Sequence, residues 1–115
     1  MREVARSVGA LVVVVAMASG CSSSESTTAV ERGRRVYMAN CIVCHNPDPM
    51  RAGSAGPEVA GASRELLEAR VLHASYPPGY TPKRTTKAMV ALPFLAAHLD
   101  ELAAFLQAVQ TPTAN

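Results

Sequence analysis

The sequence predicts a small all-α domain, and three features of its 115 residues support that fold class. Near the C-terminus, apolar side chains recur every three or four residues, which is the period of an amphipathic helix. Residues 28–31, Thr-Ala-Val-Glu, have the Ser/Thr-x-x-Glu form of a capping box, which marks the start of a helix. No segment has the pattern of a β-strand.

The first 20 residues have the layout of a secretory signal peptide. Arg2 and Arg6 make a basic start, residues 8–18 are apolar, and small residues follow. The apolar run is short for a bilayer span, and an uncleaved membrane anchor is the alternative. We therefore expect export to an oxidising compartment, and residues 1–20 do not enter the fold prediction.

Cys21 directly follows Ala-Ser-Gly, and this junction resembles the lipobox of bacterial lipoproteins, whose cysteine is acylated and becomes the new N-terminus. The resemblance implies lipidation of Cys21, with ordinary signal cleavage and a spare thiol as the alternative. Residues 22–28 are small and polar, so residues 21–28 are expected to form a lipidated flexible tether. The expected location is the periplasmic or cell-surface side of a bacterial membrane, held there by the lipid.

Three helices are predicted in the remaining domain, residues 29–110. The first should cover residues 29–40, and the second residues 64–73 with Ser63 as its N-cap. The third should cover residues 96–110. It carries the apolar stripe, which consists of Leu95, Leu99, Leu102, Leu106 and Val109, with Phe105 beside it. Segments rich in proline and glycine separate the helices and are predicted to be loops, and residues 111–115 form a tail.

The composition leaves this domain short of large apolar side chains. It has no Trp, two Phe and three Tyr. A domain of this size commonly needs a metal, a disulfide or a cofactor to complete a stable core. The formal net charge of +2 is too small to indicate nucleic-acid binding.

The strongest chemical signal is the sequence Cys41-Ile-Val-Cys44-His45. Cys-x-x-Cys-His is a haem attachment signature, in which both thiols form thioethers with the haem vinyl groups and the histidine ligates iron. A structural zinc site normally takes four ligands, whereas only these cysteines and scattered histidines are available. A thioredoxin-like dithiol should follow a strand, and none is predicted. Haem is the favoured interpretation, ahead of a dithiol and of zinc.

With these residues in view, the chain resembles a class I, mono-haem cytochrome c. Gly33-x-x-x-Tyr37-x-x-x-Cys41 is similar to that family's N-terminal helix leading into the haem motif. Residues 102–106, Leu-Ala-Ala-Phe-Leu, resemble its C-terminal helix. The resemblance implies that these two helices cross near Gly33 beside a haem-filled core. A close crossing would explain this glycine, which otherwise costs a helix about 1 kcal/mol relative to alanine.

The resemblance also implies one covalent haem c, attached to Cys41 and Cys44, with His45 as the proximal iron ligand. Residues 55–61 resemble the family's Gly-Pro-x-Leu-x-Gly segment, whose proline carbonyl accepts a hydrogen bond from the ligating histidine. Pro57 is therefore the candidate partner of His45, a contact that would orient the ring and raise its basicity.

The family's sixth iron ligand is a methionine shortly before the last helix, and Met89 has that position. Many relatives have proline directly after this methionine, whereas Val90 follows it here. The alternatives considered are Met38, Met50, His73 and His98. A thioether opposite an imidazole favours ferrous iron and raises the reduction potential.

Two further groups of residues are candidates for contacts around the haem. Tyr76 and Tyr80 could donate hydrogen bonds to the haem propionates. Lys83, Arg84 and Lys87 form a basic cluster just before Met89, which could steer an acidic redox partner or simply be solvated.

The implied function is one-electron transfer between respiratory partners at a membrane surface. Iron held by two protein ligands has no open position for a substrate, so the protein is expected to be a carrier and not an enzyme, with no small-molecule substrate. The alternative is a five-coordinate haem protein that binds or senses gases. Class II cytochromes of that kind have the haem motif near the C-terminus, whereas here it lies in the first half of the chain.

Overall fold

The computed structural model describes residues 24–110, which form three α-helices and two other helical segments. The elements in chain order are α1 (Ser24–Asn40), α2 (Arg64–Leu67), the π-helix η1 (Glu68–Leu72), the 3₁₀-helix η2 (Pro93–His98) and α3 (Leu99–Gln110). Residues 24–110 contain no strand, so the all-α prediction is confirmed. The expected signal peptide, Cys21 and the tail at residues 111–115 lie outside the described residues.

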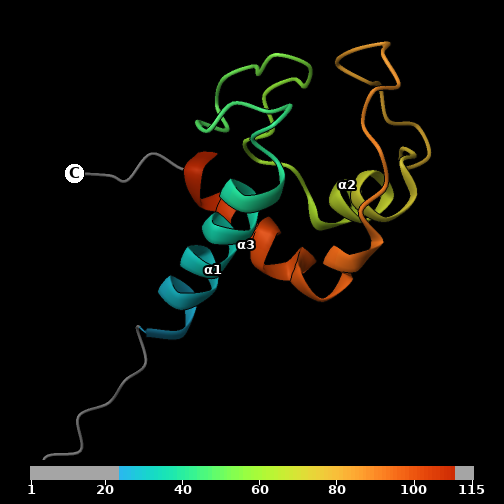
Figure 1. Cartoon of the computed structure of the whole chain (residues 1–115). Coiled ribbons are helices and arrows are strands. Elements are labelled where there is room, and N and C mark those ends of the chain that lie inside the picture. The colour runs from blue at the N-terminus through green and yellow to red at the C-terminus, as the bar shows by residue number, and fades with distance from the viewer. Residues whose placement is uncertain (1–23, 111–115) are drawn as a thin grey trace, which may run out of the picture.

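The helices α1 and α3 cross, as Figure 1 shows. Gly33 of α1 lies against Glu101 and Phe105 of α3 at this crossing. A Cβ atom built on Gly33 would overlap the carbonyl oxygen of Glu101 and lie 2.9 Å from Cβ of Phe105. Only a residue without a side chain allows the two backbones to approach this closely. The expected close crossing of the N- and C-terminal helices is therefore present.

The substitution Gly33→Ala is expected to lower the free energy of unfolding by about 1–3 kcal/mol, the usual cost of overpacking. Helix propensity alone would raise stability by about 1 kcal/mol, so a net loss shows that the steric overlap dominates. Urea unfolding of the folded protein measures the difference. Arg34→Ala, on the exposed face of α1, is the control and should change stability by less than about 0.5 kcal/mol. Unchanged stability in Gly33→Ala would contradict the close crossing.

The core is small and comes mainly from η2 and α3. Its buried side chains are Tyr37, Leu67, Val71, Leu95, Leu99, Leu102, Phe105 and Leu106. The rings of Tyr37 and Phe105 lie 5.5 Å apart at an angle of 52°, a tilted arrangement that aromatic pairs favour. The predicted apolar stripe thus faces the core, except that Val109 is only partly buried at its edge.

The helix boundaries differ from the predicted ones at two places. α1 begins at Ser24 instead of residue 29, since no proline or glycine between residues 24 and 28 stops the helix from extending. The last helix was expected to begin at residue 96. Instead, Pro93 begins η2, because a fixed φ angle suits the first position of a helix, and η2 continues into α3.

The second predicted helix, residues 64–73, is present as α2 followed by η1. The Ser63 hydroxyl accepts a hydrogen bond from the Leu66 N–H at 3.1 Å, as expected for an N-cap. Within the described residues, no helix combines the length and the hydrophobicity needed to cross a membrane.

Two long loops, residues 41–63 and residues 73–92, extend on the same side of the helices (Figure 1). Each loop is tied to the helices near its C-terminal end. The Gly61 N–H donates to the Leu106 carbonyl at 2.8 Å, and the Leu92 N–H donates to the Val71 carbonyl at 2.6 Å. These anchors place the two loops on either side of a space above the core.

Candidate functional site

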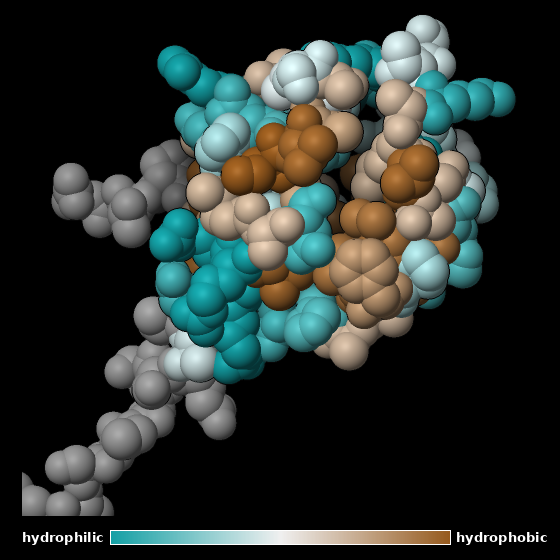
Figure 2. Space-filling model, viewed as in Figure 1, coloured by the Kyte–Doolittle hydropathy of each residue, from teal (hydrophilic) through white to brown (hydrophobic). Residues whose placement is uncertain are grey.

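A cavity of about 580 Å³ lies between the two loops and the core. Its volume is within the roughly 300–1,000 Å³ of small-molecule and cofactor sites. Figure 2 shows a hollow in the molecular surface with hydrophobic residues on both sides. The apolar part of its lining includes Val43, Val59, Leu66, Leu67, Val71, Val90, Leu92, Leu102 and Leu106. This lining favours a large apolar ligand.

Cys41, Cys44 and His45 line one wall of the cavity. The chain turns tightly after α1, because the N–H groups of Cys44 and His45 both donate to the Cys41 carbonyl, at 3.3 and 2.9 Å. This turn brings both thiols and the imidazole to the same cavity. Neither cysteine forms a disulfide.

The environment of Cys41 disfavours the dithiol and zinc alternatives. Burial raises the pKa of the Cys41 thiol to about 11. A redox-active cysteine reacts as the thiolate, which is scarce at neutral pH for such a thiol. In addition, residues 24–110 contain no group of three or more His, Cys, Asp or Glu side chains that could hold a metal ion.

The orientation of His45 is set by the loop that follows it. His45 Nδ1 lies 2.9 Å from the carbonyl oxygen of Pro57, the partner that the resemblance implied. A carbonyl can only accept a hydrogen bond, so Nδ1 carries the proton and Nε2 has the lone pair available for a metal. The contact therefore selects the tautomer that a metal-ligating histidine needs.

Gly56 lies directly against the His45 ring. A Cβ atom built on Gly56 would be 2.5 Å from Nδ1 and 2.9 Å from Nε2 of His45. The Gly56 N–H also donates to the Cys44 carbonyl at 2.9 Å, which fastens the loop to the cysteine motif. No role was predicted for Gly56 from the sequence, although its place directly before Pro57 was a usable signal.

Tyr37 ties α1 to the residue after His45. Its ring is 1% exposed, and its hydroxyl donates to the Asn46 carbonyl at 2.6 Å. Burial, with smaller contributions from Cys41 and Asp48, raises the pKa of Tyr37 to about 12, so the hydroxyl remains a donor over the physiological pH range. The hydrogen bond holds the end of the cysteine motif against the core.

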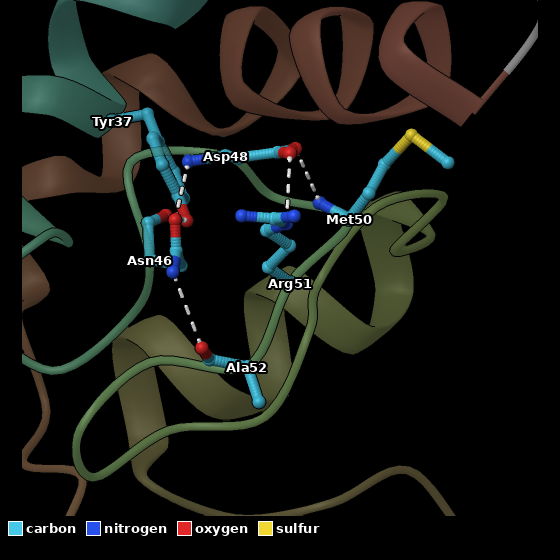
Figure 3. Close-up of polar contacts among 6 residues, drawn as sticks. All are labelled: Tyr37, Asn46, Asp48, Met50, Arg51 and Ala52. Atoms are coloured by element: carbon cyan, nitrogen blue, oxygen red, sulfur yellow. Dashed lines mark hydrogen bonds and ion pairs between the residues drawn. The ribbon is translucent and has the colours of Figure 1, made fainter.

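Side-chain contacts close the next part of this loop, as Figure 3 shows. The Asn46 side chain accepts from the Asp48 N–H at 2.9 Å and donates to the Ala52 carbonyl at 3.3 Å. Asp48 in turn accepts from the Met50 N–H at 3.0 Å. The Met50 thioether extends away from these contacts and is exposed, with 62% of the residue accessible.

Met89 lines the cavity from the second loop and packs partly buried against the core. None of the alternatives considered for the sixth ligand lines the cavity; these are Met38, Met50, His73 and His98. His98 instead faces Glu101, with Nδ1 3.1 Å from the carboxylate. Met89 is thus the candidate that shares the cavity with His45.

The predicted tyrosines, Tyr76 and Tyr80, also line the cavity, together with Arg70, which was not predicted from the sequence. The rings of Tyr76 and Tyr80 stack with centroids 5.4 Å apart and planes 7° from parallel. The Arg70 guanidinium carbon lies 4.2 Å from the centroid of the Tyr76 ring, within the range of a cation–π contact. The Tyr76 ring, which stacks on Tyr80, therefore holds a cationic group at the cavity.

Two residues of the basic cluster, Lys83 and Arg84, line the cavity, whereas Lys87 does not. Lys83 Nζ lies 3.2 Å from the Glu58 carboxylate. A backbone hydrogen bond, followed by the contact with Lys83, lowers the pKa of Glu58. Glu58 is the only acidic residue among the lining residues, which include three cationic side chains, so the cavity suits a ligand that carries negative charge.

The residues present fit the haem that the resemblance implies. Cys41, Cys44 and the imidazole of His45, with its proton on Nδ1, line one wall of the cavity, and the Met89 thioether comes from the other loop. The rest of the lining is mainly apolar, and its excess of positive charge suits the two propionates of a haem.

Comparison with known proteins agrees with this geometry. The family model described as "Cytochrome c" matches residues 30–110, which is most of the chain and includes every cavity-lining residue. The searches of curated proteins and of solved structures found no match.

Proposed function

This chain belongs to the cytochrome c family, whose members bind haem c covalently through cysteines and serve in electron transfer, and we propose that it is a one-electron carrier with a single haem c. The observation that carries the proposal is the cavity shared by Cys41, Cys44, His45 and Met89. These residues come from two loops that are distant in sequence, and the fold places them around one apolar space.

Each of these residues has a distinct role in the proposal. Cys41 and Cys44 would attach the haem through thioethers, and His45 Nε2 and the Met89 sulfur would ligate its iron. The bound haem supplies the iron that alternates between Fe(II) and Fe(III). Pro57 keeps the proton on His45 Nδ1, which supports the Nε2 lone pair as a ligand.

The cationic and tyrosine side chains of the cavity are proposed to hold the propionates. Arg70 packs on the Tyr76 ring, which stacks on Tyr80, and the hydroxyls of both tyrosines can donate hydrogen bonds. Arg84 also lines the cavity. Pairing these groups with carboxylates would neutralise charge inside a largely apolar site.

We also propose that the protein works at a membrane surface. Lipidation of Cys21 would anchor it on the periplasmic or outer side of a bacterial membrane. Its partners would be redox proteins with acidic surfaces, steered by Lys83, Arg84 and Lys87. Support for this docking face comes from the exposed apolar residues Val43 and Val90, which line the same cavity.

Replacing Met89 by alanine tests the sixth ligand. The ferric haem-loaded variant is expected to lose the sulfur–iron absorption band and to show a reduction potential lower by on the order of 0.1 V, since axial ligands set potentials over a range of about 0.8 V. Visible spectroscopy and potentiometric titration measure the two effects.

Met50→Ala is the matched control, because the Met50 side chain is exposed and does not line the cavity. It should keep both the band and the potential. A band that persists in Met89→Ala would refute the assignment. Strong carbon monoxide binding by the unaltered ferrous protein at neutral pH would instead favour a five-coordinate gas-binding protein.

A further inference from the structure

Residues 81–91, which include Met89, have little hydrogen bonding to hold them in place. Within residues 24–110, Lys83 provides the only hydrogen bonds and ion pairs that join residues 81–91 to other parts of the chain. The segment contains no helix or strand, and Val90 is 68% exposed. The Met89 side chain packs against the core, but packing of one side chain does not fix a whole loop.

Lys83 contacts Glu58 in two ways. Its ammonium group donates to the Glu58 carbonyl oxygen at 3.0 Å and lies 3.2 Å from the Glu58 carboxylate. The two side chains are 44% and 47% exposed, so the pair lies at the mouth of the cavity and not in the core. One lysine therefore bridges the two loops.

The Glu58 side of this bridge is well anchored. Glu58 directly follows Pro57, which accepts the hydrogen bond from His45. The next two residues, Val59 and Ala60, both donate their N–H groups to the Pro49 carbonyl at 2.9 Å. The Lys83 contact thus fastens a weakly held segment to a fixed one.

We propose that Lys83 is a positioning residue for the distal side of the site: its contacts with Glu58 form a latch that keeps the Met89 segment closed over the cavity. The proposal rests on the proposed function, in which Met89 binds the iron. An open segment withdraws Met89 and exposes the iron to external ligands. The latch therefore slows replacement of Met89 by such a ligand.

Two other basic side chains lie near Lys83 in the sequence, Arg84 and Lys87, and neither shares this role. Arg84 affects Glu58 only through its charge, as the smallest of the contributions to the lowered pKa of that carboxyl. Lys87 forms no ion pair or hydrogen bond with any described residue. It lies only four positions from Lys83 and carries the same charge, which makes it a matched control.

The first test measures the rate at which imidazole replaces the intrinsic ligand in the ferric haem-loaded protein, followed by visible absorption. Lys83→Met is expected to raise the rate roughly two- to fivefold at low salt, the range typical of one exposed ion pair. Lys87→Met removes the same charge and should leave the rate unchanged, and Lys83→Arg should restore the slow rate. Added salt should raise the rate of ligand replacement in the unaltered protein and in Lys83→Arg, because it screens the ion pair. It should not raise the rate in Lys83→Met, which has no such pair. Equal rates in Lys83→Met and Lys87→Met would overturn the latch.

A second test does not depend on which group binds the iron. Hydrogen–deuterium exchange of the same holoproteins should be faster in residues 81–91 of Lys83→Met, with α1 and α3 unchanged. If Met89→Ala keeps the sulfur–iron band, the ligand assignment in the proposed function fails, and this exchange experiment still decides whether the latch exists. Unchanged exchange in residues 81–91 would overturn it.

Discussion

Replacing Cys41 and Cys44 together by alanine is expected to abolish covalent haem attachment and to leave the domain without a stable fold. The cavity of about 580 Å³ would then lack its ligand. Because the cavity opens to the surface, water would fill it, and its apolar lining would lose the burial that the haem provides, at roughly 25 cal/mol per Å² of apolar surface. Whole domains are stable by only about 5–15 kcal/mol. The small protein core cannot compensate for such a loss.

Mass spectrometry of the purified variant measures the missing haem adduct, and circular dichroism during thermal unfolding measures the missing cooperative transition. The single variants Cys41→Ala and Cys44→Ala are the controls, since each keeps one thiol for attachment and should retain some haem. A double variant that is colourless but unfolds cooperatively like the unaltered protein would show that the core does not need the haem.

Replacing Gly56 by alanine is expected to displace the His45 ring and weaken the proximal side of the site. The new Cβ would lie 2.5 Å from Nδ1, far inside normal contact distance, so either the ring or the loop must move. Either movement disturbs the hydrogen bond between His45 and Pro57. We expect a loss of about 1–3 kcal/mol in the free energy of unfolding and a changed visible spectrum of the haem-loaded protein.

Gly79→Ala is the matched control for Gly56→Ala. A Cβ atom on Gly79 would meet nothing within 4 Å, but its φ of +77° strains an alanine. This variant should lose about 1–2 kcal/mol of stability and keep the spectrum of the unaltered protein. The spectrum therefore separates a displaced ligand from general destabilisation. An unchanged spectrum in Gly56→Ala would contradict the close packing of Gly56 on His45.

Structural features that depend only on residues close together in the sequence could be predicted from the sequence. The period of Leu95, Leu99, Leu102 and Leu106 follows the helix geometry of a continuous segment, and these side chains face the core. The proximity of the residues in the cysteine motif is predictable for the same reason. Two thiols and a histidine within five consecutive residues lie close together in any fold of the remaining chain. The pairing of His45 with Pro57 was reached only through the family resemblance.

The tertiary structure decided which distant residues meet. The loops carry no periodic pattern, and proline-rich segments can follow many paths, so the sequence alone did not exclude the alternatives to Met89, which were Met38, Met50, His73 and His98. The contacts of Arg70 with Tyr76 and of Lys83 with Glu58 could not be predicted from the sequence either. Sequence determines local geometry through fixed backbone periods, whereas contacts between loops depend on how packed helices orient the ends of those loops in space.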